Sequence, residues 1–455
     1  MSTDRSEASS LQDLRDRLHG ELRLPGEPGW DDARAAWQLL ADQHPDAVVE
    51  AADVHDVIET VRAARALGLG VAPQSTGHAA GALSALGGTI LLRTSRLDAV
   101  TIDPAVGTAR VEAGARWGAV AAAAAEHGLA PVAGMAASVG VAGLLLGGGL
   151  GWFARSHGLG GNAVVSFEAV DAQGRMLTVD EHQHPELLWA ARGGALPVVL
   201  TAVVIRLHPV PELTAGALMW PAERAAEVAT AWQDWIAGVP RSVTSVLRML
   251  RFPPIEQIPE PLRGRAFVGV EAAIQEDAET TARLLAPLRA LEPEQDTFAP
   301  TTAAGLAAVH GDPPEPTPAH GDSLLITEIT SEVVEALLTV AAEPVAVPLL
   351  SIELRHLGGA ASDASVDGAV TSVDGEGLLY MVGMVPVAEA LEPVRAAADA
   401  VISRLRRFGS ARQVKTFADR RTAAAALYGA SAQRLRDIRS EWDAGGVIRE
   451  AHPLS

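Results

Sequence analysis

The sequence predicts an α+β protein of two domains. The chain has 455 residues, 48% of them hydrophobic, which is enough to bury more than one core. Short strands and helices alternate between residues 47 and 209, and Pro209 and Pro211 then mark a boundary. Residues 212–410 mix helices with longer strands, a pattern typical of an antiparallel sheet that has helices on one face.

The first region begins with a segment, residues 11–40, that is expected to be helical because Leu11, Leu14 and Leu18 share one helical face. A helix follows at 54–69, "VHDVIETVRAARALGL", between two strand-like segments, "DAVVEAA" and "GVAPQS". Further strands are predicted at 89–95, 99–104, 108–114, 164–174 and 198–210, with a helix at 117–129.

The second region has predicted helices at 222–239 and 280–293. Strands are expected at 242–250, 266–274, 349–359 and 378–386, and proline-rich loops at 253–261 and 311–319. Residues 431–443, "SAQRLRDIRSEWD", read as a final helix.

Charge and composition exclude several classes of function. The net charge of −20 and the absence of any basic run argue against nucleic acid or an anionic membrane as a partner. The chain has no cysteine, so disulfides, thiol nucleophiles and thiolate metal sites are excluded. The polar N-terminus lacks the apolar core of a signal peptide, and "SVGVAGLLLGGGLGWFA" is too short and glycine-rich to span a membrane. We therefore expect a soluble cytoplasmic protein.

Two motifs of known chemistry occur in contexts that argue against them. "GLGWFA", residues 149–154, fits a dinucleotide-binding fingerprint with Asp171 about 20 residues on, but Gly158 ends any helix too early for a crossover. His182 and His184 have a spacing that could bind a metal from a strand, yet Pro185 starts a helix there. We predict no metal site.

Two glycine-rich segments form a third candidate site. "VAPQSTGHAAGAL", residues 71–83, places His78 among small residues, and residues 134–162 hold a second block of glycines. Such segments can present successive backbone N–H groups to a pyrophosphate. The same glycines could equally serve only tight turns and close strand packing, and composition alone leaves both interpretations open.

The order of motifs resembles a known family. "QSTGHA" is similar to the first motif of the FAD-binding domain of the vanillyl-alcohol oxidase and p-cresol methylhydroxylase (PCMH) superfamily. "SVGVAGLLLGGGLGW", residues 138–152, matches its second motif, and "HPELLWAARGG" and "IRLHPV" follow in order. "IELRHLGGA" (352–360) and "LYGASAQRLRDIRSEWD" (427–443) resemble later segments of berberine bridge enzyme-like bacterial oxidases.

This resemblance implies a PCMH-type flavoprotein with a cofactor domain and a substrate domain whose antiparallel sheet is covered by helices. The implied divisions are an N-terminal helical extension (1–36), an FAD-binding domain (37–211), a substrate domain (212–410) and a C-terminal segment returning to the FAD domain (411–455). The implied FAD-binding residues are Gln74, Ser75, Thr76, Gly77, His78, Ala79, Gly81, Ala82, Gly114, Gly134, Ala137, Ser138, Gly140, Val141, Gly143, Gly147, Gly148, Val203 and Val204.

In this family the histidine of the first motif carries an 8α bond to the flavin, and His78 is the matching residue. A second tether through cysteine has no counterpart, because Gly161 stands at that position. The chain departs from the family at Gln74, where an arginine is usual, and at Ala79, where a serine is usual. Two further departures are Ser431, which replaces an asparagine, and the shortened turn "ALP" (195–197).

The resemblance implies oxidation of a small alcohol, amine or activated C–H, with electrons passing through FAD to O₂ and yielding hydrogen peroxide. The alternatives are a dehydrogenase with another acceptor and a non-catalytic flavin-binding protein. Tyr428 lies on the family's "YG" motif, while Glu353 and Arg355 share one face of a predicted strand, which could face either a pocket or solvent. Tyr380 reads as a core residue, and Lys415, the only lysine, as a surface residue.

Overall fold

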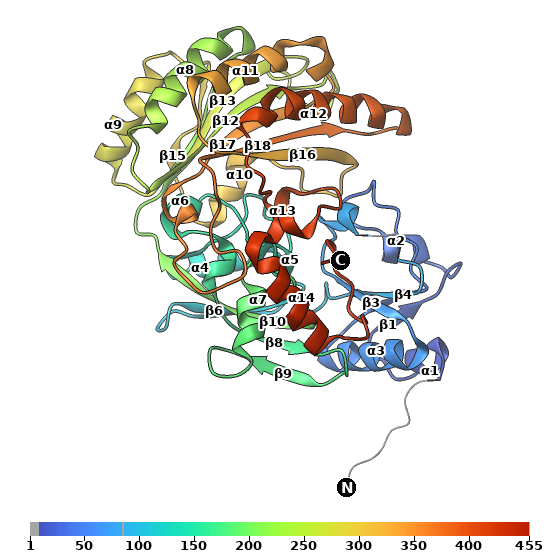
Figure 1. The fold of residues 1–455 in the computed structure, drawn as a ribbon. Helices are drawn as coiled ribbons and strands as arrows, with labels where there is room; N and C mark the ends of the chain where they lie inside the picture. The colour runs from blue at the N-terminus through green and yellow to red at the C-terminus, as the bar shows by residue number, and fades with distance from the viewer. Residues whose placement is uncertain (1–8, 84–85, 455) are drawn as a thin grey trace.

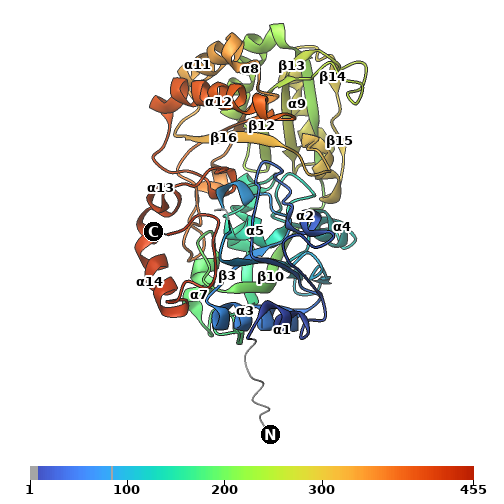
Figure 2. The ribbon, with the colours of Figure 1, turned by 90° about the vertical axis from the view of Figure 1, so that its right-hand side faces the viewer.

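The protein is described by a computed structural model that covers residues 9–83 and 86–454. Figures 1 and 2 show two halves stacked one above the other, with the N-terminal residues in the lower half and the long β-sheet in the upper half. The first eight residues of the expected N-terminal extension lie outside the described residues. None of the helices within the described ranges is both long and apolar enough to cross a lipid bilayer.

The lower half begins with a four-stranded sheet in the order β1-β2-β4-β3. Its strands are β1 (Glu21–Arg23), β2 (Ala47–Glu50), β3 (Gly70–Gln74) and β4 (Thr89–Arg93). The strands β2, β4 and β3 are parallel, and α3 (Val54–Leu67) connects β2 to β3. Asp53 caps α3 by accepting from the Asp56 N–H, and Gly68 ends the helix with a left-handed φ of 69°.

The helical expectation for residues 11–40 is wrong over most of that range. Only α1 (Leu11–Arg15) and α2 (Trp30–Arg34) are helical, and β1 lies between them and pairs with β2. The helical spacing of three leucines covers only two turns, and the glycines and prolines of residues 20–29 interrupt the helix. Pairing with β2 then fixes the extended conformation.

A second sheet, antiparallel, completes the lower half in the order β5-β6-β10-β8-β9, with β7 also paired to β10. Its strands are β5 (Val100–Asp103), β6 (Thr108–Glu112), β7 (Leu129–Pro131), β8 (Val164–Val170), β9 (Met176–Val179) and β10 (Val199–Pro209). The helices around it are α4 (Trp117–Ala125), α5 (Val141–Leu146), α6 (Ala154–His157) and α7 (Pro185–Ala191). Because α6 has only four residues, no crossover helix follows Gly151.

The upper half is one eight-stranded sheet in the order β14-β11-β13-β12-β17-β18-β16, with β15 paired to β11. Its strands are β11 (Thr214–Pro221), β12 (Val243–Arg251), β13 (Ala266–Ile274), β14 (Gln295–Asp296), β15 (Ala299–Pro300), β16 (Ala319–Ile326), β17 (Ser351–His356) and β18 (Gly377–Met384). Helices α8 (Ala225–Ile236), α9 (Ala278–Arg289), α11 (Ser331–Ala342) and α12 (Leu391–Leu405) cover its outer face, as Figure 1 shows.

The two faces of this upper sheet bury different residues. Ile352 and Leu354 of β17 pack into the core under the helices. Glu353 and Arg355, which alternate with them, lie on the opposite face, toward the lower half. On that face Val246 packs with Met135 and Trp152. The glycine-rich block of the lower half therefore packs against this face of the eight-stranded sheet.

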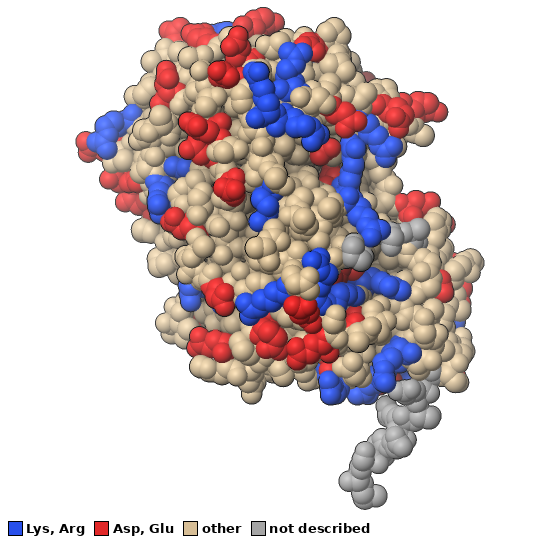
Figure 3. All heavy atoms as spheres, viewed as in Figure 1, with Lys and Arg blue, Asp and Glu red and all other residues tan. Residues whose placement is uncertain are grey.

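The chain finally returns to the lower half. Helix α13 (Ala424–Tyr428) leads down to α14 (Ala432–Trp442), which lies beside α7 in both views. Leu427, Leu435 and Ile438 are buried in the same core as Trp189 of α7. Figure 3 shows acidic and basic side chains mixed on this face, with uncharged side chains prevailing around α13 at the waist of the molecule.

Candidate functional site

The first predicted loop follows β3 and leaves its backbone donors unused. Within the described residues, the N–H groups of Thr76, Gly77, His78 and Ala79 donate to no protein acceptor. Gly77 has a φ of 86°, a conformation that favours glycine, and an added Cβ would lie 2.8 Å from Ala36 Cβ. The loop is thus a compact turn with several amides free for a ligand.

The second predicted loop meets the first at Gly140. A Cβ at Gly140 would lie 2.9 Å from Ser75 Oγ, so the Ser75 side chain packs directly against the Gly140 backbone. Ser75 Oγ also donates to the Gly114 carbonyl at 3.1 Å. In the described residues, the N–H groups of Ala137, Ser138, Ala142 and Gly143 likewise have no protein acceptor. Two sets of free donors therefore lie side by side.

The two loops, residues 75–79 and 137–143, together form a cradle of free N–H donors. His78 lies at the edge of this cradle in a defined orientation. Its ring stacks on Trp37 with centroids 4.6 Å apart and an interplanar angle of 14°. Its Nδ1 lies 2.8 Å from Thr76 Oγ1. Burial, together with the nearby Arg116 guanidinium, lowers the pKa of His78 to about 4. His78 is therefore neutral at physiological pH, with Nε2 not engaged by Thr76.

The other predicted cofactor residues lie around the two loops and the neighbouring sheet. Gln74 ends β3, while Gly81 and Ala82 form the short 3₁₀ turn after Ala79. Val141 opens α5, Gly147 ends it, and Gly148 follows with a φ of 94°. Val203 and Val204 lie in the middle of β10, paired with β6 and β8. Gly134 lies across from Leu144 of α5.

The residues present fit FAD. A dinucleotide needs N–H donors for its pyrophosphate and polar partners along its length. The cradle supplies the donors, and buried side-chain atoms with no partner among the described residues supply polar groups: Gln74 Nε2, Thr416 Oγ1 and Tyr428 Oη. Buried polar atoms are normally paired, so these three atoms are available to hydrogen-bond a polar ligand.

Arg116 and Trp37 are site residues that sequence reasoning missed. The Arg116 guanidinium lies 5.7 Å from the centre of the Trp37 ring, and the residue forms a β-bridge with Gly140. An arginine two residues after Gly114 places a positive charge at the cradle, where Gln74 replaces the family's arginine. The position of Arg116 beside the predicted cofactor residue Gly114 could have indicated that it contributes this charge. Trp37 gave no signal, because it comes from a distant segment.

Tyr428 is buried, with 1% of its surface exposed, and its hydroxyl has no partner among the described residues. The Lys415 ammonium lies 5.3 Å from the centre of its ring and donates to the carbonyls of Gly194 and Leu146. Lys415 is therefore not a free surface cation. It also lines a cavity of about 110 Å³ formed with Gly147, Gly148, Arg412 and Leu427, among others.

Glu353 and Arg355 belong to a buried cluster of charges rather than to a solvated face. His310 lies between two carboxylates, with Nδ1 2.6 Å from Glu271 and Nε2 3.2 Å from Glu353. Arg248 donates to Glu271 at 2.9 Å, and Arg355 donates to Glu353 at 3.2 Å. These five residues come from β12, β13, β17 and the short helix α10 (Ala307–His310).

The charges of this cluster stabilise one another. Burial alone would lower the pKa of His310, but Glu271 and Glu353 outweigh it and raise that pKa to about 9. Burial would raise the pKa of Glu353, but Arg355 and His310 hold it well below its usual range. Arg355 also reaches the second cofactor loop, since its Nη1 lies 3.0 Å from Met135 Sδ.

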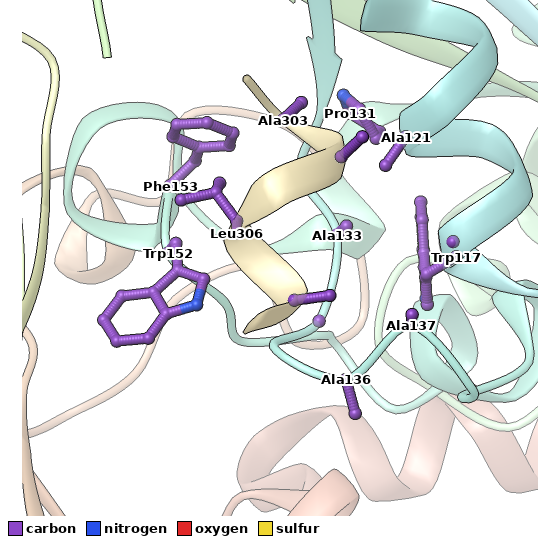
Figure 4. Close-up of a pocket in the computed structure, with 14 residues that line it drawn as sticks. Trp117, Ala121, Pro131, Ala133, Ala136, Ala137, Trp152, Phe153, Ala303 and Leu306 are labelled. Carbon is purple, nitrogen blue, oxygen red and sulfur yellow. The ribbon is translucent and has the colours of Figure 1, made fainter. Parts of the chain in front are cut away.

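A small pocket lies beside the second loop where the two halves meet. Figure 4 shows the helical segment of Leu306 between the Trp152–Phe153 corner and the helix that carries Trp117 and Ala121. The cavity measures about 30 Å³, room for no more than a few waters, and hydrophobic side chains line most of it. Residues 303–307 of the upper half and the loop of residues 131–137 of the lower half both line this cavity, so the two halves are in contact here.

Comparison with known proteins came from sequence and from structure. Residues 45–180 match the family of FAD binding domains. The uncharacterized FAD-linked oxidoreductase YvdP of Bacillus subtilis (strain 168) is 30% identical over 223 residues, 48% of this chain and 50% of that protein. The (R)-6-hydroxynicotine oxidase of Paenarthrobacter nicotinovorans is 32% identical over 205 residues, 45% of each. The chain thus spans about half the length of the curated relatives it matches.

Solved structures resemble nearly the whole chain. BBE-like 1 of Physcomitrella patens superposes with a TM-score of 0.84 at 19% identity, covering 98% of this chain and 100% of that one. The 6-hydroxy-D-nicotine oxidase of Arthrobacter nicotinovorans has a TM-score of 0.84 at 23% identity, covering 96% and 98%. At these identities the likeness establishes the fold, and the predicted α+β class with a helix-covered antiparallel sheet is confirmed.

Proposed function

We propose that this chain is an FAD-dependent oxidase of a small organic molecule and a member of the berberine bridge enzyme-like flavoproteins, a proposal supported by the FAD-binding-domain match at residues 45–180 and by the shared fold. The observation that carries the proposal is the double cradle of unused N–H donors around Ser75 and Gly140, with the neutral His78 at its edge. Bound FAD supplies the hydride acceptor, and O₂ is the proposed final acceptor.

The residues of the cradle have separate roles in this proposal. The N–H groups of Thr76 to Ala79 and the free N–H groups of the second loop, at Ala137, Ser138, Ala142 and Gly143, hold the pyrophosphate, and Arg116 adds a positive charge. His78 forms the covalent 8α bond to the flavin ring, because its imidazole is unprotonated and oriented by Trp37 and Thr76. The buried hydroxyl of Tyr428 and the orphan Gln74 amide hydrogen-bond the same cofactor.

The substrate lies between the cofactor loops and the lower face of the eight-stranded sheet, on which Glu353, Arg355 and Tyr380 stand. The substrate is an alcohol, an amine or a compound with an activated C–H. The relatives named as nicotine oxidases make hydroxylated pyridines with a cyclic amine a reasonable first class to screen. The domain division at 37–211, 212–410 and 411–455 is part of the same proposal.

The test is to purify the protein and follow its flavin. We expect a yellow protein whose absorbance near 450 nm bleaches anaerobically with one compound from a panel of alcohols, amines and hydroxylated pyridines. Readmitted air should restore the colour and release hydrogen peroxide. Recovery only with an artificial acceptor would instead favour a dehydrogenase. A protein that holds flavin which no panel compound bleaches would contradict catalysis.

A substitution in the cradle tests the binding mode. Ser75→Asp places a carboxylate beside the proposed pyrophosphate and should abolish flavin retention, because like charges repel in a site with few compensating cations. Ser75→Ala is the matched control and should keep most of the flavin. Flavin retained at the wild-type level by Ser75→Asp would mean that this loop does not contact the phosphates.

A further inference from the structure

Tyr380 and Asp419 face one another across a glycine on the lower face of the eight-stranded sheet. A Cβ added to Gly321 of β16 would lie 2.6 Å from the Tyr380 hydroxyl oxygen and 2.8 Å from Asp419 Oδ2. The Gly321 N–H donates to the same carboxylate oxygen at 3.0 Å. Both residues are half-buried, and among the described residues the Tyr380 hydroxyl forms no hydrogen bond.

The pair is bounded by both cofactor loops. The Asp419 carbonyl oxygen lies 3.0 Å from where a Cβ of Gly81 would stand, and Gly81 belongs to the first loop. The Arg355 guanidinium lies over the Phe417 ring at 4.7 Å and near the Tyr380 ring at 5.9 Å, and it contacts Met135 of the second loop. The hydroxyl and the carboxylate therefore stand where the substrate is proposed to bind.

The electrostatic surroundings suit a proton acceptor. Burial raises the pKa of Asp419 to about 6, with Asp322 of β16 adding to the rise, while the Gly321 N–H and Arg420 oppose it. Glu353 and Arg355 of β17 and Asp312 are further charged groups that act on Tyr380, and His320 of β16 lies beside Arg420 and Asp322. A carboxylate of this kind is ionised at neutral pH and still basic enough to take a proton.

The other candidate groups are less suited to this task. Glu353 is ion-paired with His310 and Arg355, which hold its pKa low and make it a weak base. Tyr428 is almost fully buried under the C-terminal helices. The Lys415 ammonium already donates to two carbonyls.

We propose that Asp419 is the catalytic base, and that the Tyr380 hydroxyl hydrogen-bonds the substrate atom from which the proton leaves. This inference rests on the proposed oxidase function. In the step, the substrate C–H bond breaks and its hydrogen leaves with both electrons to the flavin. The adjacent O–H or N–H bond breaks, its proton goes to the Asp419 carboxylate, and a C=O or C=N double bond forms. The substrate is oxidised by two electrons and the flavin is reduced by two.

The experiment compares Asp419→Asn with Asp322→Asn in the flavin-loaded protein. Asp322 is the adjacent carboxylate, paired with Arg420 at 3.3 Å, so it controls for loss of charge. With a compound that bleaches the wild type, Asp419→Asn should slow anaerobic bleaching by about 100-fold or more, the usual contribution of a general base. It should also remove the acid limb near pH 6 from the pH profile. Asp322→Asn should stay within about threefold of wild type.

A second readout does not depend on turnover. Isotope-edited infrared difference spectra of the holoprotein should show one carboxyl group titrating near pH 6 that Asp419→Asn removes and that Asp322→Asn keeps at a lower pKa, because Asp322 no longer raises it. Tyr380→Phe should slow bleaching without loss of flavin. Wild-type bleaching rates in Asp419→Asn, or no such titrating carboxyl, would overturn the role of Asp419 while leaving the oxidase function intact. A wild-type protein that no compound bleaches would instead overturn the proposed function.

Discussion

His78 is held as a neutral ring, and this state is what a covalent bond to the flavin requires. An imidazole attacks carbon only through an unprotonated nitrogen, and burial beside Arg116 lowers the pKa of His78 to about 4. Thr76 engages Nδ1, and stacking on Trp37 fixes the ring plane. The residue therefore needs no further deprotonation at neutral pH.

We predict that His78→Ala loses the covalent bond and keeps the fold. The backbone N–H groups of the loop do not depend on this side chain, so flavin should still bind but dissociate on denaturation. Acid precipitation should leave wild-type pellets yellow and move the colour of His78→Ala to the supernatant, with an intact mass of 47.2 kDa. His182→Ala, on an exposed turn, is the control. A colourless wild-type pellet would argue against the bond.

The buried cluster around His310 should make stability depend on pH. The pKa of His310 is raised above its unfolded value, so its stabilising contribution is fully present below about pH 6.5 and is lost as the pH rises through about 9. We predict that His310→Gln costs up to about 3 kcal/mol at pH 6 and less at pH 10. Urea unfolding midpoints at both pH values measure this, with His182→Gln as the exposed control. An equal loss at both values would contradict it.

At the level of single residues, the sequence predicted the candidate site residues that lie within short contiguous motifs. The cofactor loops are contiguous, so Ser75, His78 and Gly140 could be proposed from spacing and family resemblance. The cluster of Glu271 and His310 could not, because its members come from strands and a helix far apart in the chain. Strand alternation left Glu353 and Arg355 facing either a pocket or solvent, and only the packing of the whole sheet decides for burial.

Among the elements, the C-terminal segment supports the first cofactor loop. The Val71 N–H donates to the Val447 carbonyl at 2.7 Å, and the Arg449 N–H donates to the Val71 carbonyl at 2.8 Å. This parallel bridge covers the open edge of β3, which leads directly into residues 75–79. Asp443 holds the turn by accepting from the Val447 and Ile448 N–H groups.

We predict that Ile448→Ala weakens both stability and flavin binding. Ile448 is 1% exposed, and removing a buried isoleucine to alanine costs about 2–5 kcal/mol. The loss should loosen β3 and raise the flavin dissociation rate of a His78→Ala background, measured by fluorescence of released flavin. Val106→Ala, at a residue 71% exposed, is the control and should change stability by no more than about 0.5 kcal/mol. An unchanged rate of flavin release would show that the bridge between Val71 and Ile448 does not support the loop of residues 75–79.

At the scale of the whole molecule, one buried arginine links the two halves. Arg155 of α6 donates to the Val243 carbonyl at 2.8 Å and to the Leu357 carbonyl, and its Nη1 lies 2.9 Å from His356 Nε2. Burial, with some repulsion from Arg241, lowers the pKa of Arg155 to about 10, so it remains charged at neutral pH. The pattern of strands and the Pro209–Pro211 boundary predicted two halves, but nothing in the local sequence indicated this contact, because its partners are 88 to 202 residues away.

We predict that in Arg155→Met the two halves no longer unfold together in one transition. Hydrogen bonds to a buried charge each contribute about 1.5–3 kcal/mol, and the carbonyls of Val243 and Leu357 would lose this donor. Calorimetry should show a lower first transition and a split of the unfolding profile, and limited proteolysis should cut near residues 209–213. The control is Arg241→Met, which removes the repulsion on Arg155 and breaks an exposed ion pair with Asp363 that contributes about 0–1 kcal/mol. If both variants unfold like the wild type, Arg155 does not couple the halves, and contacts that do not involve it, such as the packing of Met135 and Trp152 against Val246, are sufficient to hold them together.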